Sequence, residues 1–204
     1  MNPSGRPHFL ADAPHTSEVQ ALFDGDLADN GYVMNLTRLW AHEPPALPAL
    51  FALIDAMTAA AGLGFRDRGV VVSATASTLG DSYCSLAWGG RLAEAAGEAA
   101  ATSVLNGDDR ELTDTERALV GWARQVVADP SATTLDDLAP LRAAGLDDRQ
   151  IFAITAYVAL RVAFSTVNSA LGARPDAAFA STVPDAVRQA ISYGRPILDD
   201  DTTA

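Results

Sequence analysis

The chain contains no lysine, and all 14 of its basic residues are arginine. Without a lysine amine, Schiff-base chemistry, pyridoxal phosphate attachment and a P-loop are excluded. Cys84 is the single cysteine, which excludes an internal disulfide and any metal site built from several thiolates. The three histidines disfavour a histidine-rich metal site, although a site made only of carboxylates stays open. We expect no cofactor and no metal.

Positive charge is also scarce, because 14 basic residues face 26 acidic ones and the net charge is −12. Such a chain repels phosphate backbones and anionic lipid surfaces, so neither nucleic acid nor membrane is an expected partner. The first 15 residues lack an apolar signal-peptide core, which predicts a cytoplasmic protein. The apolar run 151–167 is shorter than a membrane span and includes Arg161, so a buried helix is expected.

What the sequence does contain is helical periodicity, with almost no alternation of period two. With 204 residues, of which 49% are hydrophobic, we expect one all-α domain over 1–204. Residues 1–15 are expected to form a flexible arm and 199–204 a flexible tail. Capping residues, glycines and prolines predict helices over about 17–30, 36–40, 46–61, 66–79, 82–96, 98–105, 114–128, 135–144, 147–171 and 185–191.

The chain is organised around residues 66–97, which read as two helices broken at Leu79-Gly80-Asp81-Ser82. The run Val70-Val71-Val72 has β-branched character, but its length and its alanine-rich continuation favour a helix. The break places Cys84 in the first turn of the second helix. Backbone N–H groups there have no intrahelical partners, and the helix dipole favours negative charge. A thiol in that position is a candidate reactive group.

The order of several short motifs resembles the carboxymuconolactone decarboxylase and alkylhydroperoxidase D-like superfamily, most closely its peroxidase-related branch. These motifs are Gly31-Tyr32-Val33-x-Asn35, Arg38-Leu39-x-Ala41-His42-x-Pro44, Arg68 with the apolar run after it, Gly80-x-x-Tyr83-Cys84, Leu112-Thr113-Asp114-x-Glu116-Arg117-Ala118 and Asn168-x-x-Leu171-Gly172. The resemblance covers roughly residues 13–175. It implies an alkylhydroperoxidase D-like helical domain that assembles as a homo-oligomer, a dimer or a trimer.

Redox members of that superfamily carry the pattern Glu-x11-Cys-x2-Cys-x3-His. Aligned on Cys84 as the second cysteine, this pattern meets Gly69, Asp81 and Trp88 at its other three positions. The motif is therefore degenerate, and a catalytic disulfide within one chain is excluded. An ionised Asp81 about 5 Å from a thiolate would cost about 3 kcal/mol at an effective dielectric constant of about 20, more than the helix dipole returns.

Asp81 and Cys84 each have two interpretations. Cys84 is either a small buried apolar residue or a catalytic thiol, and Asp81 is either a helix N-cap or a general acid or base with a raised pKa. On the helix over 147–171, four polar residues form one stripe: Tyr157, Arg161, Ser165 and Asn168. Arg161 either pairs with a buried carboxylate or anchors the carboxylate or enolate of a substrate.

The catalytic candidates are Asp81 and Cys84, and the substrate-binding candidates are Tyr83, Trp88, Tyr157, Arg161, Ser165 and Asn168. We predict that Asp81, Tyr83, Cys84 and Trp88 converge on one cavity with some of the four stripe residues. The leading hypothesis is a cofactor-independent lyase, decarboxylase or isomerase that applies acid/base chemistry to a small organic molecule. One alternative is a one-cysteine hydroperoxidase that uses Cys84 with an external thiol. Another is a binding protein without catalytic activity.

Overall fold

The computed structural model describes residues 6–198, and over that range it is built from helices and loops, with no β-strand. The all-α expectation is thus confirmed. The helices are α1 (Ser17–Asn30), α2 (Asn35–Trp40), α3 (Ala46–Ala61), α4 (Phe65–Leu79), α5 (Ser82–Ala96), α6 (Glu98–Leu105), α7 (Asp114–Ala128), α8 (Ala139–Ala143), α9 (Asp148–Ala170), α10 (Phe179–Thr182) and α11 (Asp185–Ala190), with 3₁₀ turns η1 (Pro130–Ala132) and η2 (Leu135–Leu138).

Most helices begin and end where the capping signals predict. The Thr16 hydroxyl accepts the N–H of Val19 at the start of α1, and Thr113 and Glu116 form a capping box at the start of α7. Gly80 ends α4 with a left-handed φ of 69°, a conformation that costs glycine little. Residues close to each terminus therefore determine where these helices begin and end.

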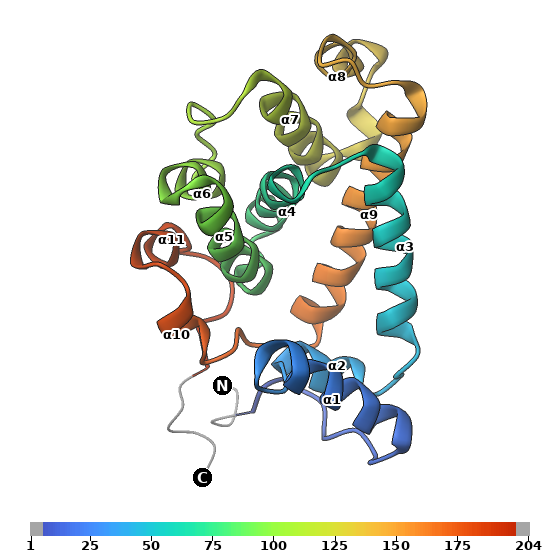
Figure 1. Ribbon diagram of the computed structural model, residues 1–204, viewed down its shortest axis with the longest axis vertical. Coiled ribbons are helices and arrows are strands. Elements are labelled where there is room, and N and C mark those ends of the chain that lie inside the picture. Colours follow the sequence, from blue (N-terminus) through green and yellow to red (C-terminus); the bar gives the residue numbers. More distant parts are fainter. Residues whose placement is uncertain (1–5, 199–204) are drawn as a thin grey trace.

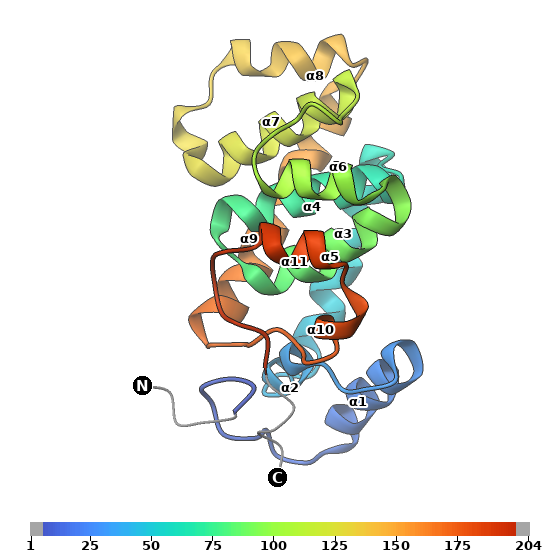
Figure 2. The ribbon, with the colours of Figure 1, turned by 90° about the vertical axis from the view of Figure 1, so that its left-hand side faces the viewer.

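Helix α4 lies at the centre of the molecule and packs against α5, α6, α7 and α9 (Figure 1). Its β-branched run Val70-Val71-Val72 is fully buried. Burying each valine stabilises the fold by about 1.5 to 3 kcal/mol, which exceeds the tenths of a kcal/mol lost through poor helix propensity. Packing thus makes this segment a helix, as expected. Figure 2 shows the helices stacked from α8 and α7 at one end to α1 and α2 at the other.

The long helix α9 packs its buried face on α3, α4 and α7. That face carries the whole predicted polar stripe, since Tyr157, Arg161, Ser165 and Asn168 are all buried. By length and mean hydropathy α9 could cross a membrane, but 44% of its most apolar window is buried inside the fold. The helix is not enclosed all round, because its opposite face exposes Phe152.

The N-terminal segment differs from the flexible arm expected over residues 1–15. The N–H of Phe9 donates to the Leu171 carbonyl at 2.9 Å, and the N–H of Arg174 donates to the Pro7 carbonyl at 2.8 Å. Gly172 has a φ of 80°, and a Cβ there would lie 2.6 Å from the Phe9 ring. Residues 7–10 are therefore packed against the end of α9, and the expectation of an arm is wrong for them. Residues 1–5 and the tail 199–204 lie outside the described residues.

The region after α7 departs from the expected single helix over 135–144. Residues 135–138 form the 3₁₀ turn η2, and α8 follows directly. Pro140 has no N–H to donate to the Asp136 carbonyl, so an α-helix cannot continue through it, and the N–H of Ala139 bonds that carbonyl instead. The short helix α10 was not anticipated, because it has four residues and no side-chain cap.

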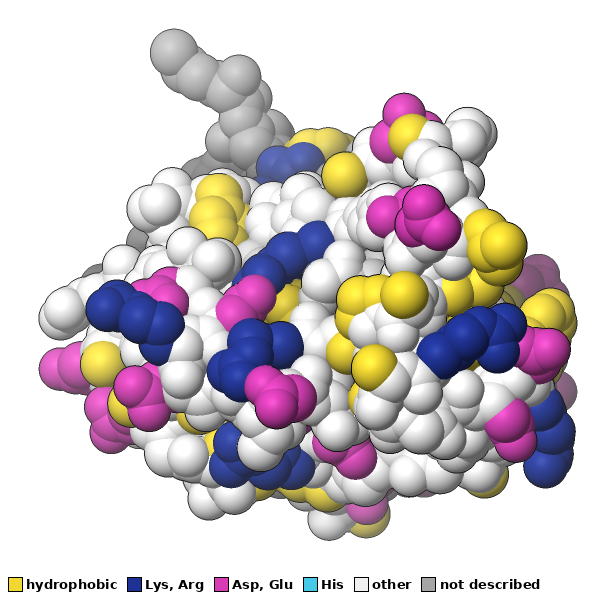
Figure 3. Space-filling view, turned by 90° about the horizontal axis from the view of Figure 1, so that it is seen from above, with side chains coloured by type: hydrophobic (Ala, Val, Ile, Leu, Met, Phe, Trp, Pro, Cys, Tyr) yellow, Lys and Arg dark blue, Asp and Glu magenta, His cyan; other side chains and the backbone are white. Residues whose placement is uncertain are grey.

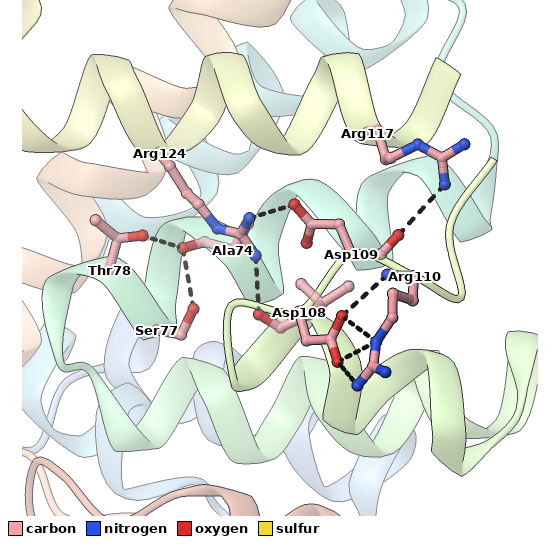
Figure 4. A network of polar contacts seen from close by, with 9 residues as sticks. Ala74, Ser77, Thr78, Asp108, Asp109, Arg110, Arg117 and Arg124 are labelled. Carbon is pink, nitrogen blue, oxygen red and sulfur yellow. Dashed lines mark hydrogen bonds and ion pairs between the residues drawn. The ribbon is translucent and has the colours of Figure 1, made fainter. Parts of the chain in front are cut away.

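Arginine–carboxylate pairs fix the loop between α6 and α7 (Figure 4). Arg124 of α7 donates to Asp109 at 2.6 Å and to the Val104 carbonyl at 3.1 Å, while Arg110 pairs with Asp108. Seen from the end that α7 and α8 form, other arginines also lie beside acidic side chains (Figure 3). On this surface, arginine side chains therefore form pairs with acidic side chains close by.

Candidate functional site

The site begins at the first turn of α5, where the chain reverses after Gly80. Asp81 caps the helix, because its Oδ1 accepts the Cys84 N–H at 3.1 Å. The N-cap interpretation of Asp81 is thus correct for one carboxylate oxygen. The other oxygen, Oδ2, is buried without a hydrogen-bond partner among the described residues. Asp81 therefore has a structural role at one oxygen and an unsatisfied acceptor at the other.

The Cys84 thiol is buried and is contacted by two residues of the α9 stripe. Arg161 Nη2 lies 3.6 Å from Sγ, and Ser165 Oγ lies 3.7 Å from it. Burial, followed by the negative charge of Asp81, raises the pKa of the thiol to about 12, although Arg161 opposes the shift. Cys84 therefore carries its proton at neutral pH.

Arg161 is the most unusual group in the site. Its exposed fraction is 3%, yet within residues 6–198 no carboxylate oxygen lies within 4.0 Å of its guanidinium nitrogens. Its Nε has no hydrogen-bond partner. The guanidinium carbon lies 5.6 Å from the Trp88 ring centroid and 5.1 Å from that of Phe164. The buried charge thus has aromatic neighbours and a thiol, but no counter-charge.

A cavity of about 480 Å³, here called the front pocket, opens onto the thiol and the guanidinium. Residues of α3, α5 and α9 form its inner walls, among them Phe51, Cys84, Trp88 and Arg161, and α1 and α2 form the rest of its lining. Aromatic walls with a few polar groups are typical of sites for small molecules.

Arg91 also lines the front pocket and was not singled out from the sequence. The side chain of Arg91 is exposed at the pocket mouth, and its guanidinium carbon lies 5.3 Å from the Trp88 ring centroid. Desolvation, followed by repulsion from Arg161, lowers its pKa. The sequence could have indicated Arg91 as a site residue, because it lies seven residues after Cys84 and so falls on the same helix face.

The predicted convergence holds for three of the four residues at the start of α5 and for one residue of the α9 stripe. Tyr83, Cys84, Trp88 and Arg161 line the front pocket. Ser165 reaches the site through its contact with the thiol. Tyr157 is buried one helical turn before Arg161, and burial raises its pKa to about 12.

Asp81 lies elsewhere, which corrects the prediction that it shares this cavity, and Asn168 lies beside the same second cavity. They line a cavity of about 340 Å³, here called the rear pocket, together with residues 79, 80, 82, 83, 169, 173, 194 and 195. Asp81 and Arg161 neither form an ion pair nor share the front pocket. The cause is the cap itself, because Oδ1 is held on the Cys84 N–H and the carboxylate is thereby turned toward the start of the helix.

Two predicted binding residues already have partners inside the protein. The Tyr83 hydroxyl donates to Asp176, whose other oxygen accepts the Asn35 N–H at 2.7 Å. Burial, followed by the nearby charge of Asp176, raises the pKa of Tyr83 well above its ordinary value. Asn168 Oδ1 accepts the Trp40 indole N–H at 2.8 Å. Asp176 was missed, because nothing in the sequence around it relates it to a tyrosine 93 residues away.

The positions of the redox motif explain why dithiol chemistry has no place here. A Cβ on Gly69 would lie 3.1 Å from Leu92 Cδ1, so a glutamate there would require the Leu92 side chain to shift by a few tenths of an ångström. Trp88 occupies the position of the motif histidine and packs beside Arg161. Within residues 6–198, no three His, Cys, Asp or Glu side chains could hold a metal ion together.

Comparison with known proteins places this geometry in a wider context. No protein-family model and no curated protein matches the sequence. Among solved structures, an alkylhydroperoxidase AhpD core, an uncharacterized peroxidase-related protein from Ralstonia eutropha JMP134, superposes with a TM-score of 0.74 at 23% identity, covering 85% of this chain and 94% of that one. An uncharacterized peroxidase-related protein from Silicibacter sp. TM1040 gives 0.74 at 20% identity, covering 89% and 98%.

A third neighbour, the debrominase Bmp8, superposes with a TM-score of 0.66 at 14% identity, covering 89% of this chain and 96% of that one. A cysteine-to-alanine variant of it is known in complex with 2,3,4-tribromopyrrole. At these identities the likeness concerns the fold, and it agrees with the resemblance that the ordered sequence motifs carry. This chain has the all-helical fold of the alkylhydroperoxidase D core.

Proposed function

We propose that this protein is a cofactor-independent enzyme of the decarboxylase or isomerase type, which binds a small organic acid in the front pocket and transfers a proton at carbon. One observation carries the proposal: the guanidinium of Arg161 is buried, lines the pocket and has no carboxylate partner among residues 6–198. Removing a guanidinium from water costs several kcal/mol unless a counter-charge compensates. A substrate anion would supply that charge.

The shape and charge of the front pocket favour a small, planar anion. Trp88 and Phe164 flank the guanidinium and offer flat apolar surfaces, and Arg91 adds a second positive charge to the lining. The debrominase of the same fold binds a planar heteroaromatic ring, which supports a planar ligand here. Asp26 and Asp29 also line the pocket and disfavour a dianion with charge spread over its whole surface.

The neutral thiol of Cys84 suits a proton donor. In a decarboxylation, the C–C bond to the carboxylate breaks, CO₂ leaves, and the electron pair stays on the substrate as an enolate. Arg161 binds the enolate oxygen. The thiol then gives its proton to carbon, which leaves a thiolate beside the Arg161 guanidinium. Asp81 acts on the thiol rather than on the substrate, because it does not line the front pocket.

A direct test follows CO₂ release and deuterium incorporation in D₂O with a panel of small β-keto and vinylogous carboxylic acids. Turnover that falls by about a hundredfold or more in Cys84→Ala and in Arg161→Met would support the proposal. Arg142→Met serves as the control, because Arg142 pairs with Asp148 on the surface. Unchanged turnover in Cys84→Ala would remove the thiol from the mechanism.

A one-cysteine hydroperoxidase is the second candidate, favoured by the peroxidase-related neighbours. It needs a thiolate, and the raised pKa of Cys84 works against one. Peroxide consumption that depends on Cys84, with a sulfenic acid trapped by dimedone, would establish it and displace the acid/base proposal. Anion binding without any turnover would instead identify a binding protein.

We also propose a homo-oligomer that buries the outer face of α3 and α9. These helices pack together and expose Leu53 by 48% and Phe152 by 70%. Large apolar side chains left exposed on packed helices are candidates for a protein interface. In sedimentation, Phe152→Glu should convert a dimer or trimer to monomer, and a wild-type chain that already sediments as a monomer would refute this assembly.

A further inference from the structure

The rear pocket lies on the other side of the first turn of α5 from the Arg161 contact with the thiol. Its walls come from the end of α4, the end of α9 and the segment after α11, which runs back past the start of α5 (Figure 2). At about 340 Å³ it has room for several water molecules. Tyr83 belongs to the lining of both pockets.

Two buried polar atoms of opposite kind belong to residues that line the rear pocket. Asp81 is 4% exposed and Asn168 is 1% exposed. Within the described part of the chain, Asp81 Oδ2 lacks a donor and Asn168 Nδ2 lacks an acceptor. Leaving a buried polar group unsatisfied costs about 1 to 3 kcal/mol. Water satisfies both kinds of atom, since it donates and accepts. The pocket is thus suited to hold ordered water against a carboxylate.

The wall opposite Asp81 is held in place by a close approach that requires glycine. Gly194 has a φ of 74°, and a Cβ there would lie 2.6 Å from Ser82 Oγ. Ser82 Oγ donates to the Arg195 carbonyl at 2.7 Å and accepts the Arg195 N–H at 2.9 Å. The segment after α11 is therefore fastened to the first turn of α5, and it forms one wall of the rear pocket.

We propose that the rear pocket is a proton-exchange route, in which water protonates Asp81 and Asp81 returns the proton to the Cys84 sulfur. The inference rests on the proposed function in one respect, because that function makes the thiol a proton donor. Each step is balanced: hydronium gives a proton to the Asp81 carboxylate and becomes water, and the resulting acid gives that proton to the thiolate. Substrate and product use the front pocket, so proton return does not require product to leave.

The geometry gives each residue a distinct role. Asp81 spans the two sides, because Oδ1 is fixed on the Cys84 backbone and the carboxylate acts on the Cys84 thiol, while Oδ2 has no partner among residues 6–198. Asn168 is a positioning residue, since its Oδ1 is held by Trp40 and its free Nδ2 can orient water beside the carboxylate. Arg161, on the other side of the thiol, stabilises the thiolate until the proton returns.

The single cysteine makes this route measurable in the substrate-free protein, because the infrared S–H stretching band reports Cys84 alone. Exchange of S–H to S–D in D₂O should slow by about a hundredfold in Asp81→Asn, the lower range for loss of a positioned acid–base group. Ala173→Leu, which fills the rear pocket, should slow exchange similarly. Ala87→Leu, which fills the front pocket, should leave the rate unchanged.

Ser169→Leu obstructs the same rear pocket from α9 and replaces Ala173→Leu if that variant does not fold. Exchange slowed by Ala87→Leu, or unaffected by both rear-pocket variants, would overturn the proposal. Because no substrate is used, these outcomes are separate from the anion-binding and turnover tests of the proposed function. If the protein binds no anion but S–H exchange depends on the rear pocket, the proton-exchange route stands and the proposed enzymatic function is refuted.

Discussion

Glu116 and Arg161 are both 3% exposed, but they differ in the hydrogen bonds that their charged groups make. Glu116 accepts hydrogen bonds from Arg66 at 2.5 and 3.3 Å and from the Thr113 N–H at 2.8 Å. Arg161 has a weak contact with a thiol and two aromatic neighbours. The carboxylate is held by its own neighbours, whereas the guanidinium faces a cavity.

The difference separates a structural charge from a functional one. A buried charge with several hydrogen bonds stabilises the local structure and is costly to remove. A buried charge that lacks them lowers stability and persists where binding uses it. The two groups are therefore expected to respond oppositely to mutation, one mainly in stability and the other mainly in binding.

The largest effect is expected for anion binding at Arg161. Truncating one partner of a buried charge pair costs about 2 to 5 kcal/mol, so Arg161→Met should weaken benzoate binding by about a hundredfold or more. Its free energy of unfolding should stay equal or rise, because an uncompensated buried charge is removed. Titration calorimetry and urea unfolding measure the two quantities, with Arg142→Met as the control. Equal benzoate affinity in both variants would erase the distinction between Glu116 and Arg161.

Glu116→Ala should show the reverse pattern. Loss of the capping interaction costs about 1 kcal/mol, and the pair with the partly exposed Arg66 adds a similar amount after allowance for solvent screening. Unfolding in urea should thus report a loss of about 2 kcal/mol, while benzoate affinity stays unchanged. Burial opposes ionisation, but the bonds from Arg66 and Thr113 hold the pKa of Glu116 below its ordinary 4.5, so the wild type loses this contribution in acid. A stability loss near zero would contradict the pairing.

His8 extends the comparison to a buried base, because neither of its ring nitrogens has a hydrogen-bond partner among the residues that the structure describes. Burial, followed by the charges of His42 and Arg38, lowers its pKa below 6.5, and Asp12 opposes the shift. The unfolded chain therefore binds more protons just below pH 6.5, so stability falls as pH decreases through that region, by at most about 1.4 kcal/mol per unit. His8→Phe should flatten this part of the profile in thermal melts. An unchanged slope would place the titration on another group.

The smallest stability effect is expected for Asp81, which is satisfied at one oxygen only. Asparagine caps helices about as well as aspartate, so Asp81→Asn should change the unfolding free energy by only a few tenths of a kcal/mol. The thiol should respond more clearly, because removing the negative charge lowers the pKa of Cys84 from about 12. Thiolate absorbance against pH measures this. A thiol pKa that does not fall would show that Asp81 is too distant to act on it.

Local chemistry explains how much could be predicted from the sequence. Thr16, Thr113 and Gly80 act on atoms within four residues, so the ends of α1, α7 and α4 were predictable. The polar stripe of α9 was predictable for the same reason, since it depends only on helical periodicity. The likeness to the alkylhydroperoxidase D fold followed from motif order and agrees with the superposed structures.

The parts that could not be predicted depend on distant contacts. The hydrogen bond between Tyr83 and Asp176 joins residues 93 positions apart. It engages within the protein a tyrosine hydroxyl that the sequence alone suggested for substrate binding. The separation of Asp81 from Arg161 depends on how α5 packs against α9 and on the segment fastened by Ser82 and Arg195. Sequence patterns also do not reveal that residues 7–10 are packed, because their hydrogen bonds go to residues 171–174.

The central claim is that Arg161 holds a small anion in the front pocket, and a crystal structure with bound benzoate tests it most directly. We predict carboxylate oxygens within hydrogen-bonding distance of the Arg161 guanidinium and the ring beside Trp88, with the Cys84 sulfur facing the ligand. An empty front pocket in which a carboxylate of the protein itself pairs with Arg161 would contradict the account, because the guanidinium would then be a structural charge like Glu116.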